Sequence, residues 1–248
     1  MRQAMIFAAG LGTRLRPLTD SIPKALVPVG GTPLLWHVLM RLKAAGFERL
    51  VVNVHHFASQ IVDYLRENDN FGLDVRISDE SGRLLETGGG IRKALPLFDS
   101  TAPVLIHNVD ILSNVDLSAF YDSVDDSGII SPDALLLVSQ RQTKRYLLFD
   151  DSSRLVGWTN IETKEIKSPY PHLDVEQQKM FAFSGIHLVA PSLFPLLADG
   201  PERFPIMDFY LQHCAQVNIM AKFQPDLRLL DVGKVDTLAD AEKFLSMM

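Results

Sequence analysis

Cysteine is nearly absent from this chain of 248 residues, since Cys214 is the single one and no internal disulfide can form. A lone thiol is typical of proteins from a reducing compartment, so we expect a cytoplasmic protein in which Cys214 is buried rather than nucleophilic. No apolar run approaches the roughly 20 residues of a membrane-spanning helix. The apolar start of the chain is short and runs into Arg14 and Arg16, unlike a signal peptide. These absences predict a protein without a membrane partner.

Histidine patterns typical of zinc sites are also missing, although the chain has seven histidines. We find no Ser-His-Asp or Cys-His arrangement for nucleophilic catalysis. The 24 lysines and arginines are outnumbered by 30 aspartates and glutamates, giving a formal net charge of −6. That balance disfavours nucleic acid as a partner. An acidic protein can still bind phosphates where a few cations converge, so their placement matters more than their sum.

The first half of the chain alternates between strand-like and helix-like segments. We expect strands over residues 5–9, 50–54, 73–77 and 104–106, and helices over residues 34–45, 58–65 and 90–97. Thr32 is expected to cap the first helix, with Pro33 at its first position and Gly46 after its end. Short apolar strands separated by helices form βαβ units. The predicted fold class is therefore α/β, with a mostly parallel, Rossmann-like sheet flanked by helices.

The second half is less regular. We expect strands over residues 134–138 and 181–189, a hairpin of residues 146–149 and 155–158, a polar excursion over 160–179, and a terminal helix over 239–245. No internal repeat or low-complexity linker interrupts the chain. We therefore predict a single domain over residues 1–248, with an excursion at about 140–190.

Ligands of parallel α/β sheets bind beyond the carboxyl ends of the strands. Three places in this chain qualify: the segment from Gly10 onward, residues 53–55 and residues 108–110. These strand ends are where we expect the chemistry.

A glycine- and arginine-rich loop follows the first strand. Gly10 and Gly12 permit close approach of backbone amides to an anion, and Arg14, Arg16 and Lys24 add positive charge. Guanidinium groups suit phosphate oxygens. The loop matches neither a dinucleotide fingerprint nor a Walker loop. In the simpler interpretation, the glycines only make a turn and the arginines are solvated. The combination of all these features favours a phosphate loop.

A longer pattern around this loop resembles the signature of sugar-nucleotide pyrophosphorylases, the nucleotidyltransferases that make NDP-sugars. The matching residues are Ala9-Gly10-x-Gly12-Thr13-Arg14-Leu15-x-Pro17-Leu18-Thr19 and Pro23-Lys24-Ala25-Leu26-Val27-Pro28-Val29. The resemblance continues, in the family's order, through residues 86–90, 108–110, 183–186 and 231–233. It implies a GT-A-like nucleotidyltransferase fold, and it is greatest to short members that make UDP-N-acetylmuramic acid or GDP-mannose-type products.

The resemblance also implies roles for individual residues. Arg14 and Lys24 would be catalytic, and Asp110 and Asp231 would bind Mg²⁺ as the cofactor. The implied nucleotide-binding residues are Ala8, Ala9, Gly10, Gly12, Thr13, Glu80, Thr87, Gly88 and Asn108, and the implied sugar-binding residues are Phe183, Ser184 and Gly185. From the residues alone, each aspartate is as well explained as a turn residue, Phe183 as core packing, and residues 88–90 as a loop before a helix.

The implied reaction joins a nucleoside triphosphate to a sugar 1-phosphate and releases pyrophosphate. The form of residues 86–90 favours UTP with N-acetylmuramic acid 1-phosphate, and GTP with mannose 1-phosphate or heptose 1-phosphate remains an alternative. A glycosyltransferase would usually show Asp-x-Asp, whereas Asn108-Val109-Asp110 stands here. A non-catalytic regulatory subunit should have lost Arg14, Lys24 or an aspartate. The sequence gives no prediction of oligomeric state.

Overall fold

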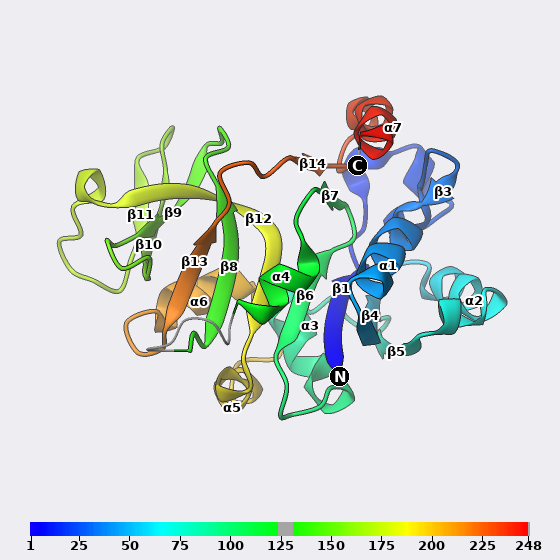
Figure 1. The fold of residues 1–248 in the computed structure, drawn as a ribbon, viewed down its shortest axis with the longest axis horizontal. Coiled ribbons are helices and arrows are strands. Elements are labelled where there is room, and N and C mark those ends of the chain that lie inside the picture. The colour runs from blue at the N-terminus through cyan, green and yellow to red at the C-terminus, as the bar shows by residue number, and fades with distance from the viewer. Residues whose placement is uncertain (124–130, 248) are drawn as a thin grey trace.

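The computed structural model describes residues 1–123 and 131–247, which are organised around one large mixed sheet (Figure 1). Its strands are β1 (Arg2–Phe7), β4 (Phe47–Val54), β5 (Asp74–Asp79), β6 (Val104–Asn108), β8 (Ala134–Ser139), β9 (Arg145–Phe149), β10 (Leu155–Asn160), β11 (Glu165–Lys167), β12 (Lys179–Val189) and β13 (Ile219–Phe223). The strand order is β11-β10-β9-β12-β6-β1-β4-β5, and β8 pairs with both β12 and β13.

The half of the sheet built from the first part of the chain is parallel. Strand β1 pairs in parallel with β4 on one side and β6 on the other, and β5 continues beyond β4. The short apolar strands are buried on both faces, as crossover helices require. The predicted α/β class is therefore confirmed.

The other half of the sheet is largely antiparallel. Strand β12 runs antiparallel to β6, β8 and β9, and β9, β10 and β11 form a meander. The hairpin predicted around residues 150–154 is confirmed as β9 and β10. The meander forms the left end of the sheet in Figure 1, remote from α2 (Ala58–Glu67) on the right.

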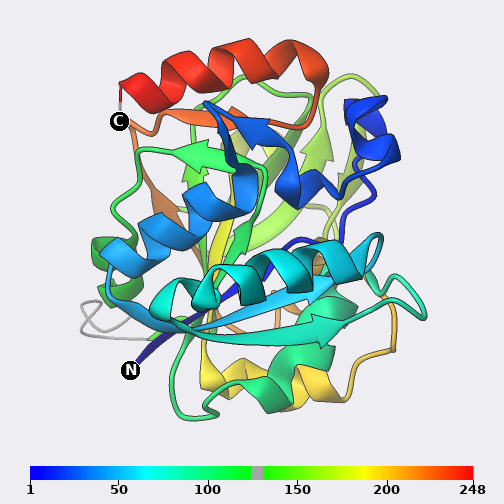
Figure 2. The same cartoon turned by 90° about the vertical axis from the view of Figure 1, so that its right-hand side faces the viewer.

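Helices cover both faces of the sheet (Figure 2). Besides α2 they are α1 (Leu34–Ala44), α3 (Glu86–Ala94), α4 (Leu117–Asp122), α5 (Phe194–Ala198), α6 (Ile206–His213) and α7 (Leu238–Ser246). Side chains alternate across β1: Ala4 and Ile6 join the core under α1 and α2, whereas Met5 joins the core under α3, α5 and α6. The result is a three-layer arrangement with the sheet in the middle.

Two short strand pairs lie outside the main sheet. Strands β2 (Pro28–Val29) and β3 (Thr32–Pro33) precede α1, and β7 (Ile111–Ser113) pairs antiparallel with β14 (Leu229–Asp231). The second pair returns the end of the chain to the strand end of β6. It therefore brings two distant segments together at the expected ligand side.

Two predictions of local structure were wrong. Thr32 does not cap α1, because it pairs in β3 and Pro33 is the residue at the N-cap, without a side-chain hydrogen bond. The third helix begins at Glu86 instead of residue 90, so residues 88–90 lie inside α3. Gly46 does follow the end of α1 with φ of +79°, and its amide donates to the carbonyl oxygen of Lys43.

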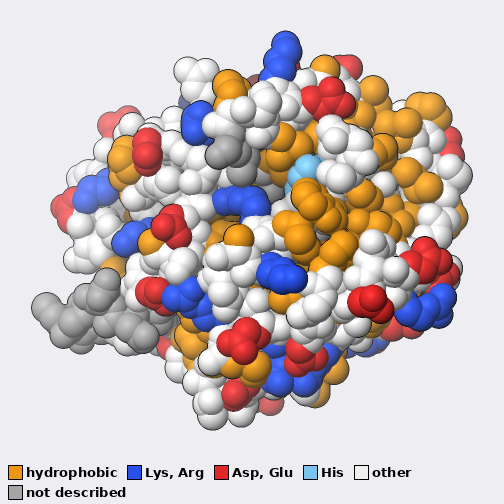
Figure 3. Space-filling view, turned by 45° about the vertical axis from the view of Figure 1, so that its right-hand side comes forward, with side chains coloured by type: hydrophobic (Ala, Val, Ile, Leu, Met, Phe, Trp, Pro, Cys, Tyr) orange, Lys and Arg blue, Asp and Glu red, His pale blue; other side chains and the backbone are white. Residues whose placement is uncertain are grey.

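Among the described residues, no helix is long and apolar enough to cross a membrane. Cys214 is buried, as predicted, and burial raises the pKa of its thiol to about 11. It is therefore protonated near neutral pH and a poor nucleophile. The face drawn in Figure 3 shows basic and acidic side chains interspersed around its lower part and hydrophobic side chains gathered around one histidine.

Candidate active site

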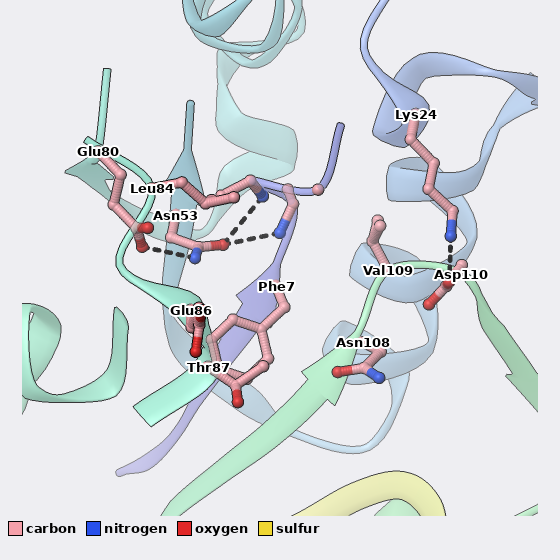
Figure 4. Close-up of a pocket in the computed structure, with 13 residues that line it drawn as sticks. Phe7, Lys24, Asn53, Glu80, Leu84, Glu86, Thr87, Asn108, Val109 and Asp110 are labelled. Atoms are coloured by element: carbon pink, nitrogen blue, oxygen red, sulfur yellow. Dashed lines mark hydrogen bonds and ion pairs between the residues drawn. The ribbon is translucent and has the colours of Figure 1, made fainter. Parts of the chain in front are cut away.

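The three strand ends singled out in the sequence meet around one cavity of about 260 Å³ (Figure 4). Its lining residues are Phe7, Ala8, Ala9, Gly10, Lys24, Asn53, Glu80, Leu84, Glu86, Thr87, Asn108, Val109 and Asp110. They come from the carboxyl ends of β1, β4, β5 and β6, from the segment of Lys24, and from the loop before α3 and its start. The topology of a parallel sheet thus brings part of the predicted set to one cavity, namely Ala8, Ala9, Gly10, Lys24, Glu80, Thr87, Asn108 and Asp110. The other predicted residues, Gly12, Thr13, Arg14, Gly88, Phe183, Ser184, Gly185 and Asp231, lie outside its lining.

Asn53 organises one wall of this cavity. Its Oδ1 accepts hydrogen bonds from the amides of Ala8 at 2.7 Å and Ala9 at 3.2 Å, and its Nδ2 donates to Glu80 Oε1 at 2.7 Å. Only 3% of Asn53 is exposed. The sequence placed Asn53 at a strand end without indicating a role for it. Its position there, as a polar residue closing an apolar strand, was the available signal.

The same hydrogen-bond network uses polar groups of three predicted nucleotide-binding residues within the protein. The amides of Ala8 and Ala9 are already bonded to Asn53, so these residues offer the cavity their surface and not their N–H groups. Glu80 is 1% exposed, and its Oε2 accepts from the amide of Leu85 at 3.0 Å. Its carboxylate therefore holds the cavity wall together.

The loop after β1 keeps free donors. In the described part of the chain, the amides of residues 10–13 have no hydrogen-bond partner. Gly12 has φ of +63°, and a Cβ there would lie 2.9 Å from Thr19 Cγ2. Thr19 Oγ1 donates to the carbonyl oxygen of Gly12 at 2.8 Å, which fixes the turn. Thr13 and Arg14 are exposed beside it. The loop can therefore present amides and a guanidinium to an anion.

Lys24 and Asp110 form an ion pair at the edge of the cavity, with side chains only 11% and 16% exposed. Both residues line the cavity. Lys24 comes from the segment after the phosphate loop and Asp110 from the turn that follows β6. A paired cation and carboxylate are thus held where a charged ligand would enter.

Asp231 is brought beside Asp110 by the pairing of β14 with β7. The amide of Val232 donates to the carbonyl oxygen of Asp110 at 2.8 Å. A Cβ on Gly233 would lie 2.6 Å from Asp231 Oδ1 and 2.7 Å from Arg14 Nη2. Asp231 and Arg14 therefore approach the same point, beside Gly233. The sequence indicated no separate role for Gly233.

The start of α3 is fixed by the segment that leads into α6. Thr87 Oγ1 accepts from the amide of Ile206 at 2.9 Å, and the amide of Gly88 donates to the carbonyl oxygen of Phe204 at 2.8 Å. Thr87 lines the cavity, whereas Gly88 does not. The amide predicted to meet a nucleotide at Gly88 is therefore already used within the protein.

The three predicted sugar-binding residues differ from one another. Gly185 has φ of +78°, and a Cβ there would lie 2.9 Å from Asn108 Nδ2, so β12 bulges against the cavity lining. Ser184 is 2% exposed, and its Oγ accepts from the amide of Ile186 at 3.3 Å. Phe183 lines a second hollow instead of the first cavity. Only Phe183 is thus open to a ligand through its side chain.

His107 lies directly behind the site, on β6. Burial lowers the pKa of its imidazole to about 4, and its ring Nδ1 lies 2.8 Å from the carbonyl oxygen of Asn108. It is neutral near pH 7 and is buried away from the cavity. His107 therefore supports the strand end and is not a candidate for acid–base work.

The carboxylates of Asp110 and Asp231 suit a hard cation. Within residues 1–123 and 131–247 no group of three or more histidine, cysteine, aspartate or glutamate side chains could hold a metal. Mg²⁺ is usually bound by one or two carboxylates together with substrate phosphates and waters. Two neighbouring aspartates beside an anion-binding loop fit that requirement, whereas a closed zinc-type site does not.

Comparison with known proteins identifies relatives of this chain. Residues 3–149 match a family model described as nucleotidyl transferase. An N-acetylmuramate alpha-1-phosphate uridylyltransferase from Caulobacter vibrioides is 50% identical over 123 residues, which is 49% of this chain and 50% of that protein. The chain thus matches about half the length of this relative. A D-glycero-alpha-D-manno-heptose 1-phosphate guanylyltransferase from Campylobacter jejuni is 26% identical over 93% of this chain and 94% of its own.

Solved structures show the same fold. A putative glucose-1-phosphate thymidylyltransferase from Bacillus anthracis superposes with a TM-score of 0.80 over 100% of this chain and 96% of its own, at 16% identity. At that identity the likeness concerns the architecture alone. It agrees with the fold class predicted from the order of strands and helices.

Proposed function

The chain belongs to the nucleotidyl transferase family, and from that membership we propose that it transfers a nucleotide from a nucleoside triphosphate to a sugar 1-phosphate. The preferred pair is UTP and N-acetylmuramic acid 1-phosphate. One arrangement supports the proposal: Lys24 pairs with Asp110 at the lining of the cavity, and Arg14 and Asp231 approach one point beside Gly233, close to the backbone of Asp110.

The reaction needs positioning more than acid–base chemistry. A phosphate monoester has a second pKa of about 6, so the acceptor is largely a dianion near neutral pH. An oxygen of that dianion attacks the α-phosphorus of the triphosphate. The bond from the α-phosphorus to the oxygen bridging to the β-phosphate breaks, and pyrophosphate leaves with that electron pair. No proton has to be removed from the nucleophile.

The protein's part is to hold two polyanions together. In this proposal the free amides of residues 10–13 and Arg14 bind the phosphates that leave. Lys24 offsets charge at the attacked phosphorus, after its contact with Asp110 is exchanged for substrate. Asn53 and Glu80 keep the cavity wall in shape. Thr87 and Asn108 line the space for the rest of the nucleotide.

Asp110 and Asp231 would hold the magnesium ion that this family's chemistry implies. When bound, such an ion neutralises phosphate charge and thereby favours approach of the second anion. Asp231 ends β14 and Asp110 lies in the turn just before β7, its partner strand, so the backbone hydrogen bonds of this pair hold the two residues near each other.

The choice of base and sugar comes from the relatives. The Caulobacter protein shares 50% identity over a region that is 49% of this chain, and its name supplies the uridylyl group and the N-acetylmuramate acceptor. A guanylyl transfer to a heptose or mannose 1-phosphate is the second candidate. It is favoured by the Campylobacter relative, which matches 93% of the chain. A non-catalytic role is disfavoured because Arg14, Lys24 and both aspartates are all present.

Pyrophosphate release from the four common triphosphates, each paired with a panel of sugar 1-phosphates, tests the proposal. We expect turnover only with triphosphate, sugar phosphate and Mg²⁺ together, and highest with UTP and N-acetylmuramic acid 1-phosphate. Mass analysis of the product identifies the NDP-sugar. Preference for GTP and heptose 1-phosphate would select the second candidate, and no turnover with any pair would contradict both.

A further inference from the structure

A second hollow lies between the β9–β11 meander and α6, and we call it the cationic hollow. It has a volume of about 470 Å³. Its lining residues are Arg141, Thr143, Arg145, Leu147, Trp158, Glu165, Lys167, Phe183, Met207, Asp208 and Leu211. Three of them are basic and two are acidic, on a chain whose formal net charge is −6.

Both acidic lining residues pair with the same lysine. Lys167 Nζ lies 3.7 Å from Asp208 Oδ1 and 4.0 Å from Glu165 Oε1. Arg141 and Arg145 have no carboxylate partner among the described residues. The hydrogen bond of Arg141 is to the carbonyl oxygen of Phe183, at 3.3 Å. Two guanidinium groups therefore face the hollow with their charge uncompensated.

The floor of the hollow is apolar. Leu147 and Leu211 are buried, and Trp158 and Phe183 are half-buried with their rings at the lining. An apolar and aromatic floor with a few charged groups at the rim is typical of a small-molecule site. It suits the apolar face of a sugar ring whose charged substituent points to the rim.

The cationic hollow is next to the nucleotide cavity. Phe183 lines the hollow and Gly185, two residues on in β12, touches Asn108 of the cavity. Residues 183 and 185 are at most about 7 Å apart along the chain, the span of a fully extended strand. On the other side, Ile206 bonds to Thr87 of the cavity while Met207, the next residue, lines the hollow. The two hollows are therefore separated by only one or two residues of chain on each side, a distance on the scale of one sugar phosphate.

We propose that Arg141 and Arg145 bind a carboxylate on the acceptor sugar, so that the enzyme selects an acidic sugar 1-phosphate. This inference rests on the proposed function. The acceptor's phosphate must lie at the nucleotide cavity to react, so it cannot also neutralise the two arginines. A second anion on the sugar can, and a planar carboxylate matches a guanidinium through paired hydrogen bonds. N-acetylmuramic acid 1-phosphate carries such a group on its lactyl ether.

N-acetylglucosamine 1-phosphate has the same ring and N-acetyl group without the lactyl carboxylate, so it is the matched acceptor. We would measure kcat and KM for both acceptors in the wild type, in Arg141→Gln, in Arg145→Gln and in Lys144→Gln. Lys144 is the control because it is exposed, pairs with Glu162 at 2.8 Å and lies outside the hollow's lining.

Each arginine variant should lower kcat/KM for the acidic acceptor by about 10- to 100-fold, mainly through KM, as loss of a charge-assisted hydrogen bond does. Turnover of N-acetylglucosamine 1-phosphate should change less than about 2-fold, a contrast that a general loss of structure would not give. Lys144→Gln should match the wild type with both acceptors.

The inference is overturned if the wild type does not prefer the acidic acceptor. It is also overturned if the arginine variants lower kcat/KM equally for both acceptors while the melting temperatures of the variants match that of the wild type. If a variant melts early, Arg145→Lys, which keeps the charge, should restore part of the preference. If the wild type turns over neither acceptor, the preferred acceptor of the proposed function is wrong. Calorimetry of the wild type with each of the two sugar phosphates then tests the role of the arginines alone. Equal affinities for the two would refute that role.

Discussion

The amide of Val232 donates a hydrogen bond to the carbonyl oxygen of Asp110 at 2.8 Å. This backbone contact extends the pairing of β14 with β7 to the turn after β6. Together they set Asp231 beside Asp110, although most of the second half of the chain lies between them. Because the contact is made by backbone atoms, substitutions of either aspartate side chain leave it in place, and their effects can be assigned to the carboxylates.

Arg14 and Arg16 form a matched pair in the phosphate loop. Arg14 Nη2 approaches the point beside Gly233 that Asp231 also approaches, whereas Arg16 pairs with Asp20 at 3.3 Å with both side chains largely exposed. Arg14→Gln should lower kcat/KM by about 10²- to 10³-fold, as loss of a preorganised charge-stabilising donor does. Arg16→Gln should cost only a few-fold. Steady-state pyrophosphate release measures kcat/KM in both variants. Equal losses would show that Arg14 contributes no more than the exposed Arg16.

Asn53 should be essential for stability. Asn53→Ala would leave the buried amides of Ala8 and Ala9 and the carboxylate of Glu80 without their partner, and we expect a loss of about 3 kcal/mol in the free energy of unfolding. Asn68→Ala is the control, because Asn68 makes one exposed hydrogen bond to the carbonyl oxygen of Tyr64. It should cost less than about 1 kcal/mol. Urea unfolding of the two variants measures both changes, and similar losses of unfolding free energy would refute the role given to Asn53.

Gly89 leaves no room for a side chain. A Cβ there would lie 2.3 Å from the carbonyl oxygen of Glu202, which is backbone and cannot swing away. Gly89→Ala should therefore destabilise the protein by about 2 kcal/mol, despite the higher helix propensity of alanine. Gly82→Ala, with no atom within 4 Å of its Cβ, should change stability by less than about 0.5 kcal/mol. Thermal melts of both variants test this, and a more stable Gly89→Ala protein would contradict the packing of α3.

His187 should make the protein sensitive to acid. Burial lowers the pKa of its imidazole to about 3, and neither ring nitrogen has a hydrogen-bond partner among the described residues. The unfolded chain, with a histidine pKa of about 6.5, binds the proton more readily. Stability should therefore be full above about pH 6.5 and fall as the pH drops towards 3, by about 2 kcal/mol at pH 5 from this residue.

The variant His187→Phe removes this proton-binding group. Its free energy of unfolding should fall less between pH 8 and pH 5 than that of the wild type, with a remaining slope from His107. His56→Phe, at an exposed histidine, should keep the wild-type difference. Urea titrations at the two pH values measure the effect. If all three proteins lost the same free energy on acidification, the buried imidazole would not be its source.

The sequence predicted where the site lies better than how it is built. Strand ends follow from apolar runs that stop at Gly10, Asn53 and Asn108, and a parallel sheet brings them together without knowledge of any side-chain contact. The hydrogen-bond network of Asn53 and Glu80 could not be predicted in this way. It depends on which side chains are buried together, which periodicity does not encode.

The start of α3 shows the same limit. Three consecutive glycines have low helix propensity, so the pattern predicted a loop before residue 90. In the fold, residues 88 and 89 donate to the carbonyl oxygen of Phe204, and the helix packs too closely for any side chain at Gly89. Tertiary contact overrides propensity here, because only a residue without a side chain permits this close approach.

The central claim is that Asp110 and Asp231 act together on one triphosphate. The most direct test is kcat/KM for pyrophosphate release with UTP, N-acetylmuramic acid 1-phosphate and Mg²⁺ in Asp110→Asn, Asp231→Asn and the double variant. Each single variant should lose about 10²-fold or more, and the double variant should be little worse than the poorer single one, because groups that act as a unit are not additive. Losses that multiply in the double variant, or a single variant with wild-type turnover, would contradict the account.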